Sequence, residues 1–106
     1  MTEITAEQLK NRLDKKVQFN MIDVREQWEY EEFNIGARNM PLSIFMQFMD
    51  ELDDFKDEEI IVHCKMGGRT MQAVSILESY GFKNVVAYLG GMDEWIARYG
   101  ITNISR

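Results

Sequence analysis

Hydrophobic residues recur along this chain with two different spacings, and the spacing switches several times. Spacings of three and four place apolar side chains on one face of a helix, whereas short unbroken apolar runs are typical of strands in a parallel sheet. The helical spacing predicts helices at residues 4–13, 43–55, 69–81 and 92–100, with a single helical turn after residue 26. The apolar and β-branched runs predict strands at residues 17–25, 37–40, 60–64 and 85–89.

Several predicted helix ends carry residues that satisfy free backbone groups. Thr5 is followed three positions later by Gln8, which is the pattern of a capping box. Ser43 is an acceptable N-cap for the second helix, and Gly81 stands where a left-handed residue closes the third. We expect the third helix to place Ala73, Val74, Leu77 and Tyr80 on one side.

Strands that alternate with helices over short connections indicate an α/β domain with a central, mainly parallel sheet flanked by helices. The length of 106 residues is that of one domain, so residues 1–106 are expected to form a single unit. Ligands of open parallel sheets bind beyond the carboxyl ends of the strands. Three predicted strands end in residues 23–25, Cys64 and residues 90–91, and we expect these ends to converge at one edge of the sheet.

Composition and charge exclude some classes of partner. Hydrophobic residues make up 45% and charged residues 28% of the chain, as in ordinary soluble proteins. Eighteen acidic against twelve basic residues give a net charge of −6, which argues against nonspecific binding to nucleic acid or to an anionic membrane. Residues 1–9 lack the basic start and apolar stretch of a signal peptide. The single cysteine cannot form an internal disulfide or a multi-cysteine metal site, so we expect a cytoplasmic protein without metal or cofactor.

The stretch VHCKMGGRT carries the candidate chemistry. Its cysteine, Cys64, ends an apolar strand and precedes a glycine-rich turn into a helix, where free backbone N–H groups can point at an anion. These groups, with Lys65 and Arg69, would favour the thiolate form of Cys64. Gly67 and Gly68 permit positive φ angles and a close approach of the backbone. The alternative is a buried structural cysteine before a simple turn, but the combination of features favours an anion-handling thiolate.

Neighbouring residues have narrower expected roles. Arg69 can bind an oxyanion in bidentate fashion, whereas Lys65 would act as a mobile point charge. Thr70 could donate its hydroxyl to the sulfur or cap the following helix. Because side chains alternate along a strand, His63 should point to the face opposite Cys64 and belong to the core or support the site from behind.

In this order the motifs resemble those of single-domain rhodaneses, a family of sulfurtransferases. The matching segments span nearly the whole chain and are ITAEQL, IDVREQWEY, IGARNMP, the loop from Cys64 to Arg69, and LGGMDEW. The resemblance implies a three-layer rhodanese-like fold and a reaction in which Cys64 takes the outer sulfur of a donor such as thiosulfate as a persulfide. The persulfide sulfur would pass to cyanide or to a thiol, including that of a thioredoxin-like protein.

The resemblance also implies a set of site residues. Cys64 would be catalytic, and Asp23 and Arg25 would support the loop, although a plain structural ion pair explains them as well. The substrate-binding set would be Lys65, Met66, Gly67, Gly68, Arg69 and Thr70.

Two other functions compete with sulfur transfer. Cysteine-dependent phosphatases and arsenate reductases share the strand, the cysteine and the arginine, but the phosphatases have five residues between the last two, where this chain has four. Phosphate ester cleavage also benefits from a general acid, and this loop contains neither Asp nor Glu. The second alternative is a rhodanese-like binding or sulfur-relay module for a protein partner, with Met66, Trp28 or Met92 on the contact surface.

Overall fold

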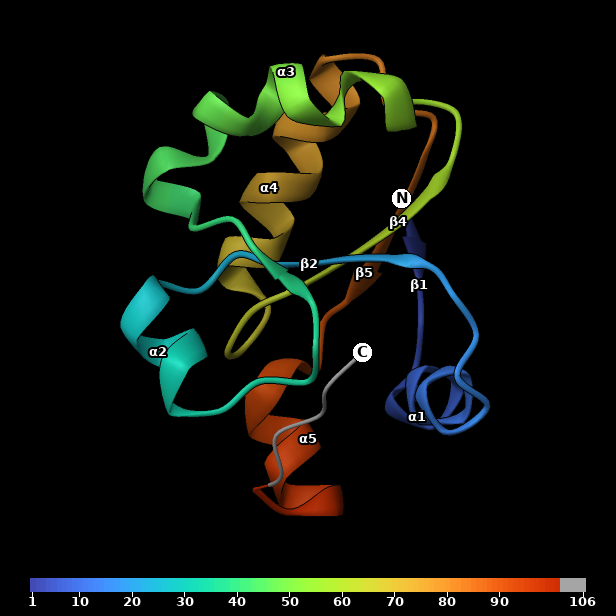
Figure 1. The fold of residues 1–106 in the computed structure, drawn as a ribbon, viewed down its shortest axis with the longest axis vertical. Coiled ribbons are helices and arrows are strands. Elements are labelled where there is room, and N and C mark those ends of the chain that lie inside the picture. Colours follow the sequence, from blue (N-terminus) through green and yellow to red (C-terminus); the bar gives the residue numbers. More distant parts are fainter. Residues whose placement is uncertain (102–106) are drawn as a thin grey trace.

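A parallel sheet of five strands runs through the middle of the computed structural model, which describes residues 1–101 (Figure 1). The order across the sheet is β1-β5-β4-β2-β3, and each pairing within it is parallel. The strands are β1 (Thr2–Glu3), β2 (Asn20–Asp23), β3 (Arg38–Asn39), β4 (Glu59–His63) and β5 (Asn84–Tyr88). The expected α/β architecture with a central parallel sheet is confirmed.

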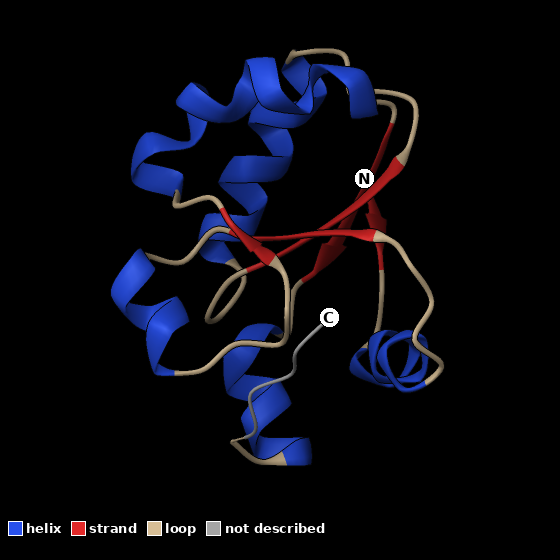
Figure 2. Ribbon diagram, viewed as in Figure 1, coloured by secondary structure: helices blue, strands red, loops and turns tan. Residues whose placement is uncertain are grey.

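Helices cover both faces of this sheet (Figure 2). Helices α1 (Ala6–Asp14) and α5 (Gly91–Tyr99) pack on one face, while α4 (Gly68–Ser79), η1 (Leu42–Phe48) and α3 (Met49–Leu52) pack on the other. The remaining helical segments are α2 (Gln27–Glu32) and η2 (Asp53–Phe55). The fold therefore has three layers with a separate apolar core on each side of the sheet.

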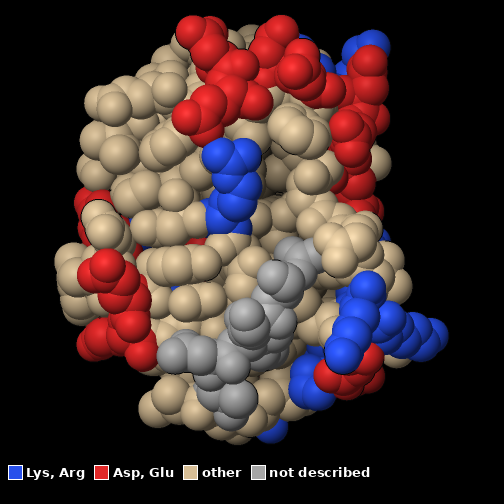
Figure 3. Space-filling view, viewed as in Figure 1, with Lys and Arg blue, Asp and Glu red and all other residues tan. Residues whose placement is uncertain are grey.

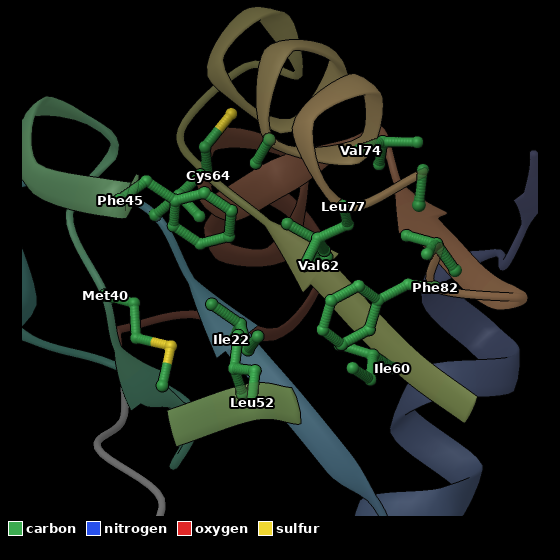
Figure 4. Close-up of a cluster of buried hydrophobic side chains, with 14 of the residues drawn as sticks. Ile22, Met40, Phe45, Leu52, Ile60, Val62, Cys64, Val74, Leu77 and Phe82 are labelled. Carbon is green, nitrogen blue, oxygen red and sulfur yellow. The ribbon is translucent and has the colours of Figure 1, made fainter. Parts of the chain in front are cut away.

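Alternation along the strands divides the apolar residues between the two cores. Ile22, Val62 and Cys64 belong to the core under α4, and Figure 4 shows them on the same side of the sheet. Met21 and Ile61, one position earlier on the same strands, belong to the core under α1 and α5. Central strands of a sheet covered on both faces are expected to be continuously apolar for this reason.

The segment predicted as one helix over residues 43–55 is instead broken into η1, α3 and η2. The prediction of Ser43 as an N-cap is wrong, because the helical segment starts after Pro41 and bends at Ile44, where φ is −126°. The hydroxyl of Ser43 lies 3.1 Å from Oε2 of Glu26. The Ser43 side chain thus binds Glu26 from another segment and does not cap the helix.

The other residues predicted to mark helix ends are found in those positions. The capping box of α1 is present, with the Gln8 N–H donating to Oγ1 of Thr5 at 3.1 Å. Gly81 has a φ of +91° beyond the end of α4, as predicted. Tyr80 is 41% exposed, unlike the three residues predicted on the same side, Ala73, Val74 and Leu77, which are buried. Strand β1 was not predicted, and β2 is shorter than the predicted 17–25.

No helix within residues 1–101 has the length and apolar character needed to span a membrane.

Candidate active site

The carboxyl ends of β2, β4 and β5 meet at one edge of the sheet, as predicted. Asp23 is in register with His63, and His63 with Tyr88. Beyond β5 the chain enters α5, whose first turn returns to the loop after β4. There the N–H of Met92 donates to the carbonyl oxygen of Cys64 at 2.9 Å. This hydrogen bond ties the backbone of Cys64, at the end of β4, to the first turn of α5.

Cys64 follows β4 directly and faces the core under α4. It is only 1% exposed, and Figure 4 shows its sulfur pointing away from Ile22 and Val62. The backbone N–H of Gly67 donates to this sulfur, with nitrogen and sulfur 3.1 Å apart. The loop after β4 therefore curls back and presents an amide to the sulfur atom itself.

The two glycines of the loop differ in what they provide. Gly67 has a φ of +104°, and a Cβ there would lie 2.7 Å from the carbonyl oxygen of Leu89, so both the conformation and the packing require glycine. Gly68 is the first residue of α4, and no atom from elsewhere in residues 1–101 lies within 4 Å of where a Cβ would stand. The expectation of a positive φ is confirmed for Gly67 and wrong for Gly68, because the helix has already begun there.

Both cations of the loop are paired with carboxylates from other helices. Nζ of Lys65 lies 3.1 Å from the carboxylate of Asp93 in α5, and both side chains are about half exposed. Arg69 forms a bidentate pair with Glu29 of α2, at 2.6 and 3.0 Å. The hydrogen bond from Arg69 holds the pKa of Glu29 below its usual range, and the same bond raises the pKa of Arg69. Sequence reasoning missed Glu29 and Asp93, which join the loop only through the tertiary fold.

Asp23 and Arg25 form a buried ion pair behind the site. Nη2 of Arg25 lies 2.8 Å from Oδ2 of Asp23, and the two side chains are 3% and 0% exposed. The same guanidinium donates to the backbone carbonyls of Glu29 at 3.3 Å and of Phe33 at 2.9 Å. Arg25 therefore fixes α2, the helix that carries the carboxylate partner of Arg69.

The remaining predicted site residues divide between the interior and the surface. Thr70 is fully buried in the first turn of α4, and its hydroxyl has no hydrogen-bond partner within residues 1–101, so neither of its two expected bonds is present. The N-cap of α4 is Gly67 instead. Met66 and Trp28 are 70% and 65% exposed, whereas Met92 is buried and does not contribute to the surface.

His63 lies on the sheet face opposite Cys64, as predicted. Its side chain is fully buried beside the ring of Tyr88, and neither ring nitrogen has a hydrogen-bond partner in the described part of the chain. Nε2 is 3.9 Å from Oδ2 of Asp23, which is too far for a hydrogen bond. Burial lowers the pKa of His63, while the negative charge of Asp23 acts in the opposite direction. No group of three or more His, Cys, Asp or Glu side chains within residues 1–101 is arranged to hold a metal ion.

Comparisons with known proteins agree with this geometry. The family model of the Rhodanese-like domain matches residues 5–98. A protein of Allochromatium vinosum named sulfurtransferase is 29% identical over 102 residues, which cover 95% of this chain and 92% of the relative. YrkF of Bacillus subtilis, named as a candidate sulfur carrier protein, is 33% identical over 97 residues; the match covers 91% of this chain but only 51% of YrkF. The chain thus spans about half the length of that relative.

A solved structure supports the same relationship. The Rhodanese-like domain of the Alr3790 protein from Anabaena sp. superposes with a TM-score of 0.80 at 31% sequence identity. The superposition covers 98% of this chain and 80% of the Anabaena chain.

Proposed function

The chain belongs to the rhodanese-like domain family, and from this membership we propose that it is a sulfurtransferase of the thiosulfate sulfurtransferase type. It moves a sulfane sulfur from thiosulfate or a similar donor to cyanide or a thiol, through a persulfide on Cys64. The relatives named as a sulfurtransferase and as a candidate sulfur carrier support a role in sulfur transfer or sulfur relay. A single cysteine that must stay reduced to react fits a cytoplasmic location.

The contact between Gly67 and Cys64 carries the proposal. With its N–H donating to the sulfur at 3.1 Å, the loop is closed around one sulfur atom. A phosphate ester would need its tetrahedral group seated in front of the sulfur, inside a wider ring of amides. Four residues between Cys64 and Arg69 suit the smaller anion, which is first the thiolate and then the persulfide.

In the reaction, the thiolate of Cys64 attacks the outer sulfur of the donor. A new sulfur–sulfur bond forms, the original bond of the donor breaks, and sulfite leaves with the electron pair when the donor is thiosulfate. The persulfide anion stays beside the loop amides until cyanide or a thiolate removes its outer sulfur. Sulfite leaves without a general acid, so the lack of Asp and Glu between Cys64 and Arg69 costs nothing in this reaction.

The other loop residues have supporting roles in the proposal. In the proposal, the accessible loop residues 65, 66, 68 and 69 contact the donor. Gly67 is indispensable for the shape of the loop, and the buried Thr70 supports the loop from the first turn of α4. Asp23 and Arg25 act at a distance by fixing α2 and, through Glu29, the orientation of Arg69.

A protein thiol is the acceptor that the surface around the loop supports best. Met66 in the loop and Trp28 on α2 are both more than half exposed. Exposed large apolar residues are typical of contact sites for other proteins. A thioredoxin-like protein offers such a thiol, and a relay of this kind would turn over small acceptors slowly.

Sulfur transfer is tested by mixing the purified protein with thiosulfate and cyanide and measuring thiocyanate. The wild-type chain should form thiocyanate, and Cys64→Ser should form none. Hydrolysis of an aryl phosphate without thiocyanate formation would favour the phosphatase function instead.

A further inference from the structure

The carboxylate that holds Arg69 is itself fixed in place. Oε1 of Glu29 accepts both the Arg69 guanidinium at 2.6 Å and the backbone N–H of Glu26 at 3.0 Å, the latter as part of the capping box of α2. Its side chain is 11% exposed. Arg25 anchors the same residue through its backbone carbonyl. The Glu29 carboxylate is therefore held in one position, and binding of an anion to Arg69 does not readily displace it.

Both cations of the loop, Lys65 and Arg69, are paired with carboxylates. The charge of Arg69 is offset by Glu29, and that of Lys65 by Asp93. Helix α2 carries further carboxylates at Glu31 and Glu32 and no Lys or Arg. Figure 3 shows acidic side chains gathered on the side of the molecule where α2 lies. An anionic donor approaching Cys64 therefore meets fixed negative charge next to the guanidinium it would bind.

The charge of the donor decides how much this matters. The energy between a fixed carboxylate and a donor scales with the donor's charge, so a dianion is opposed twice as strongly as a monoanion of the same shape. We propose that Glu29 is a specificity-determining residue that ties up Arg69 and selects monoanionic sulfane-sulfur donors over the thiosulfate dianion. The proposal rests on the proposed sulfur transfer at Cys64 and concerns only which donors it accepts.

A thiosulfonate is a suitable monoanionic donor. The Cys64 thiolate attacks its outer sulfur, the sulfur–sulfur bond of the donor breaks, and a sulfinate leaves with the electron pair. One negative charge stays on the persulfide and one on the sulfinate, so no oxidant, reductant or proton is required. Methanethiosulfonate and thiosulfate share the outer sulfur and the tetrahedral sulfonyl group and differ by one charge, which makes them a matched pair of probes.

The test compares kcat/KM for the two donors, with cyanide as the acceptor, in the wild type and in Glu29→Gln. Glutamine preserves the size of the side chain and an acceptor for the Glu26 N–H, so α2 keeps its cap. Removing the charge should raise kcat/KM about threefold for methanethiosulfonate and about tenfold for thiosulfate, because the logarithm of the effect doubles with the donor's charge. Glu31→Gln removes an equal charge from an exposed position of α2 and should change either value by less than about twofold.

Ionic strength gives a second measurement that needs no variant. In the wild type, raising the ionic strength from about 0.01 to about 0.15 M should raise kcat/KM for thiosulfate relative to methanethiosulfonate, since salt screens repulsion. A fall would show net attraction of the dianion and would overturn the proposal. An unchanged kcat/KM for thiosulfate in Glu29→Gln would also overturn the proposal, because the charge of Glu29 would then have no effect on the donor. A lower kcat/KM would overturn it as well, because Glu29 would then serve to orient Arg69 toward the donor. Absence of sulfur transfer from both donors in the wild type would refute the proposed function itself, which separates the two failures.

Discussion

Gly91 lies directly against the backbone of Lys65. A Cβ at Gly91 would stand 2.4 Å from the carbonyl oxygen of Lys65 and 2.7 Å from that of Cys64, and its φ of +65° is one that other residues rarely adopt. The next two residues, Met92 and Asp93, donate their N–H groups to those same carbonyls. The start of α5 is therefore part of the framework of the active-site loop, and it depends on glycine for the close approach.

Gly91→Ala should displace the loop and depress sulfur transfer by at least about tenfold, because small misplacements of reacting groups cost large factors in rate. Gly100→Ala is the matched control, with a φ of +83° but no atom of the described residues 1–101 packed within 4 Å of its Cβ position. Both variants should lose about 1–3 kcal/mol of stability through backbone strain. Thiocyanate assays and thermal unfolding separate the two effects, and equal activity in the two variants would contradict the framework role.

The two loop glycines should respond differently to alanine. Gly67→Ala places a Cβ 2.7 Å from the Leu89 carbonyl at a φ of +104°, so the amide that contacts Cys64 should move and activity should fall. Gly68→Ala meets open space at a helical position and should leave activity within about twofold, with stability equal or higher by about 0.5 kcal/mol. Activity and chemical denaturation measured on both variants test this, and a reversed order would refute the assignment.

Breaking the buried ion pair should weaken the whole domain. Arg25→Met leaves the Asp23 carboxylate unpaired in the interior and frees two carbonyls of the α2 segment, which should cost about 3–5 kcal/mol. Arg38→Met removes an exposed partner of Glu51 and should cost less than about 1 kcal/mol. Urea unfolding of both variants provides the comparison. A similar small loss in both would mean that the Asp23–Arg25 pair does not hold α2.

His63 should make stability depend on pH. Burial lowers its pKa in the folded protein below the ordinary value of about 6.5, with Asp23 opposing and Arg25 reinforcing the shift. Between the two pKa values the unfolded chain binds more protons, so the contribution of His63 is complete above about pH 6.5 and is lost as the pH falls toward the folded pKa. His63→Met removes the titrating group and its unpartnered nitrogens while keeping the apolar bulk.

The two proteins should therefore diverge in acid. At neutral pH the methionine variant should be as stable as the wild type or more stable by about 1 kcal/mol. Below about pH 6.5 the gap should widen by up to about 1.4 kcal/mol per pH unit. Chemical denaturation at several pH values measures the gap, and parallel curves would show that His63 keeps the same proton affinity on unfolding.

Much of the fold could be predicted from the sequence because the residues that determine each helix and strand lie close together in the chain. The capping box of Thr5 and Gln8 acts within one helical turn, and the run from β4 through Cys64 into α4 is continuous in the chain. The ion pair of Arg69 with Glu29 joins residues 40 positions apart, and that of Lys65 with Asp93 joins residues 28 apart. Spacing alone carries no signal for such pairs.

Two predictions about hydroxyl side chains near helix starts failed for different reasons. Ser43 has the side chain of an N-cap, but its hydroxyl donates to Glu26 on another segment. The helical segment already begins after Pro41 and bends at Ile44. Thr70 was expected to hydrogen-bond locally, yet the turn around Gly67 delivers a backbone amide to the sulfur instead. A tertiary contact decided the case of Ser43, whereas a local backbone bond between residues three positions apart decided that of Thr70.

The mass of the intact protein after exposure to a sulfur donor, without acceptor, tests the central claim most directly. Wild-type protein treated with thiosulfate or methanethiosulfonate should gain one sulfur atom on Cys64, and cyanide should remove it as thiocyanate. Cys64→Ser should gain none. A wild-type protein that gains no sulfur from either donor, or gains it equally with Cys64→Ser, would contradict sulfur transfer through a Cys64 persulfide.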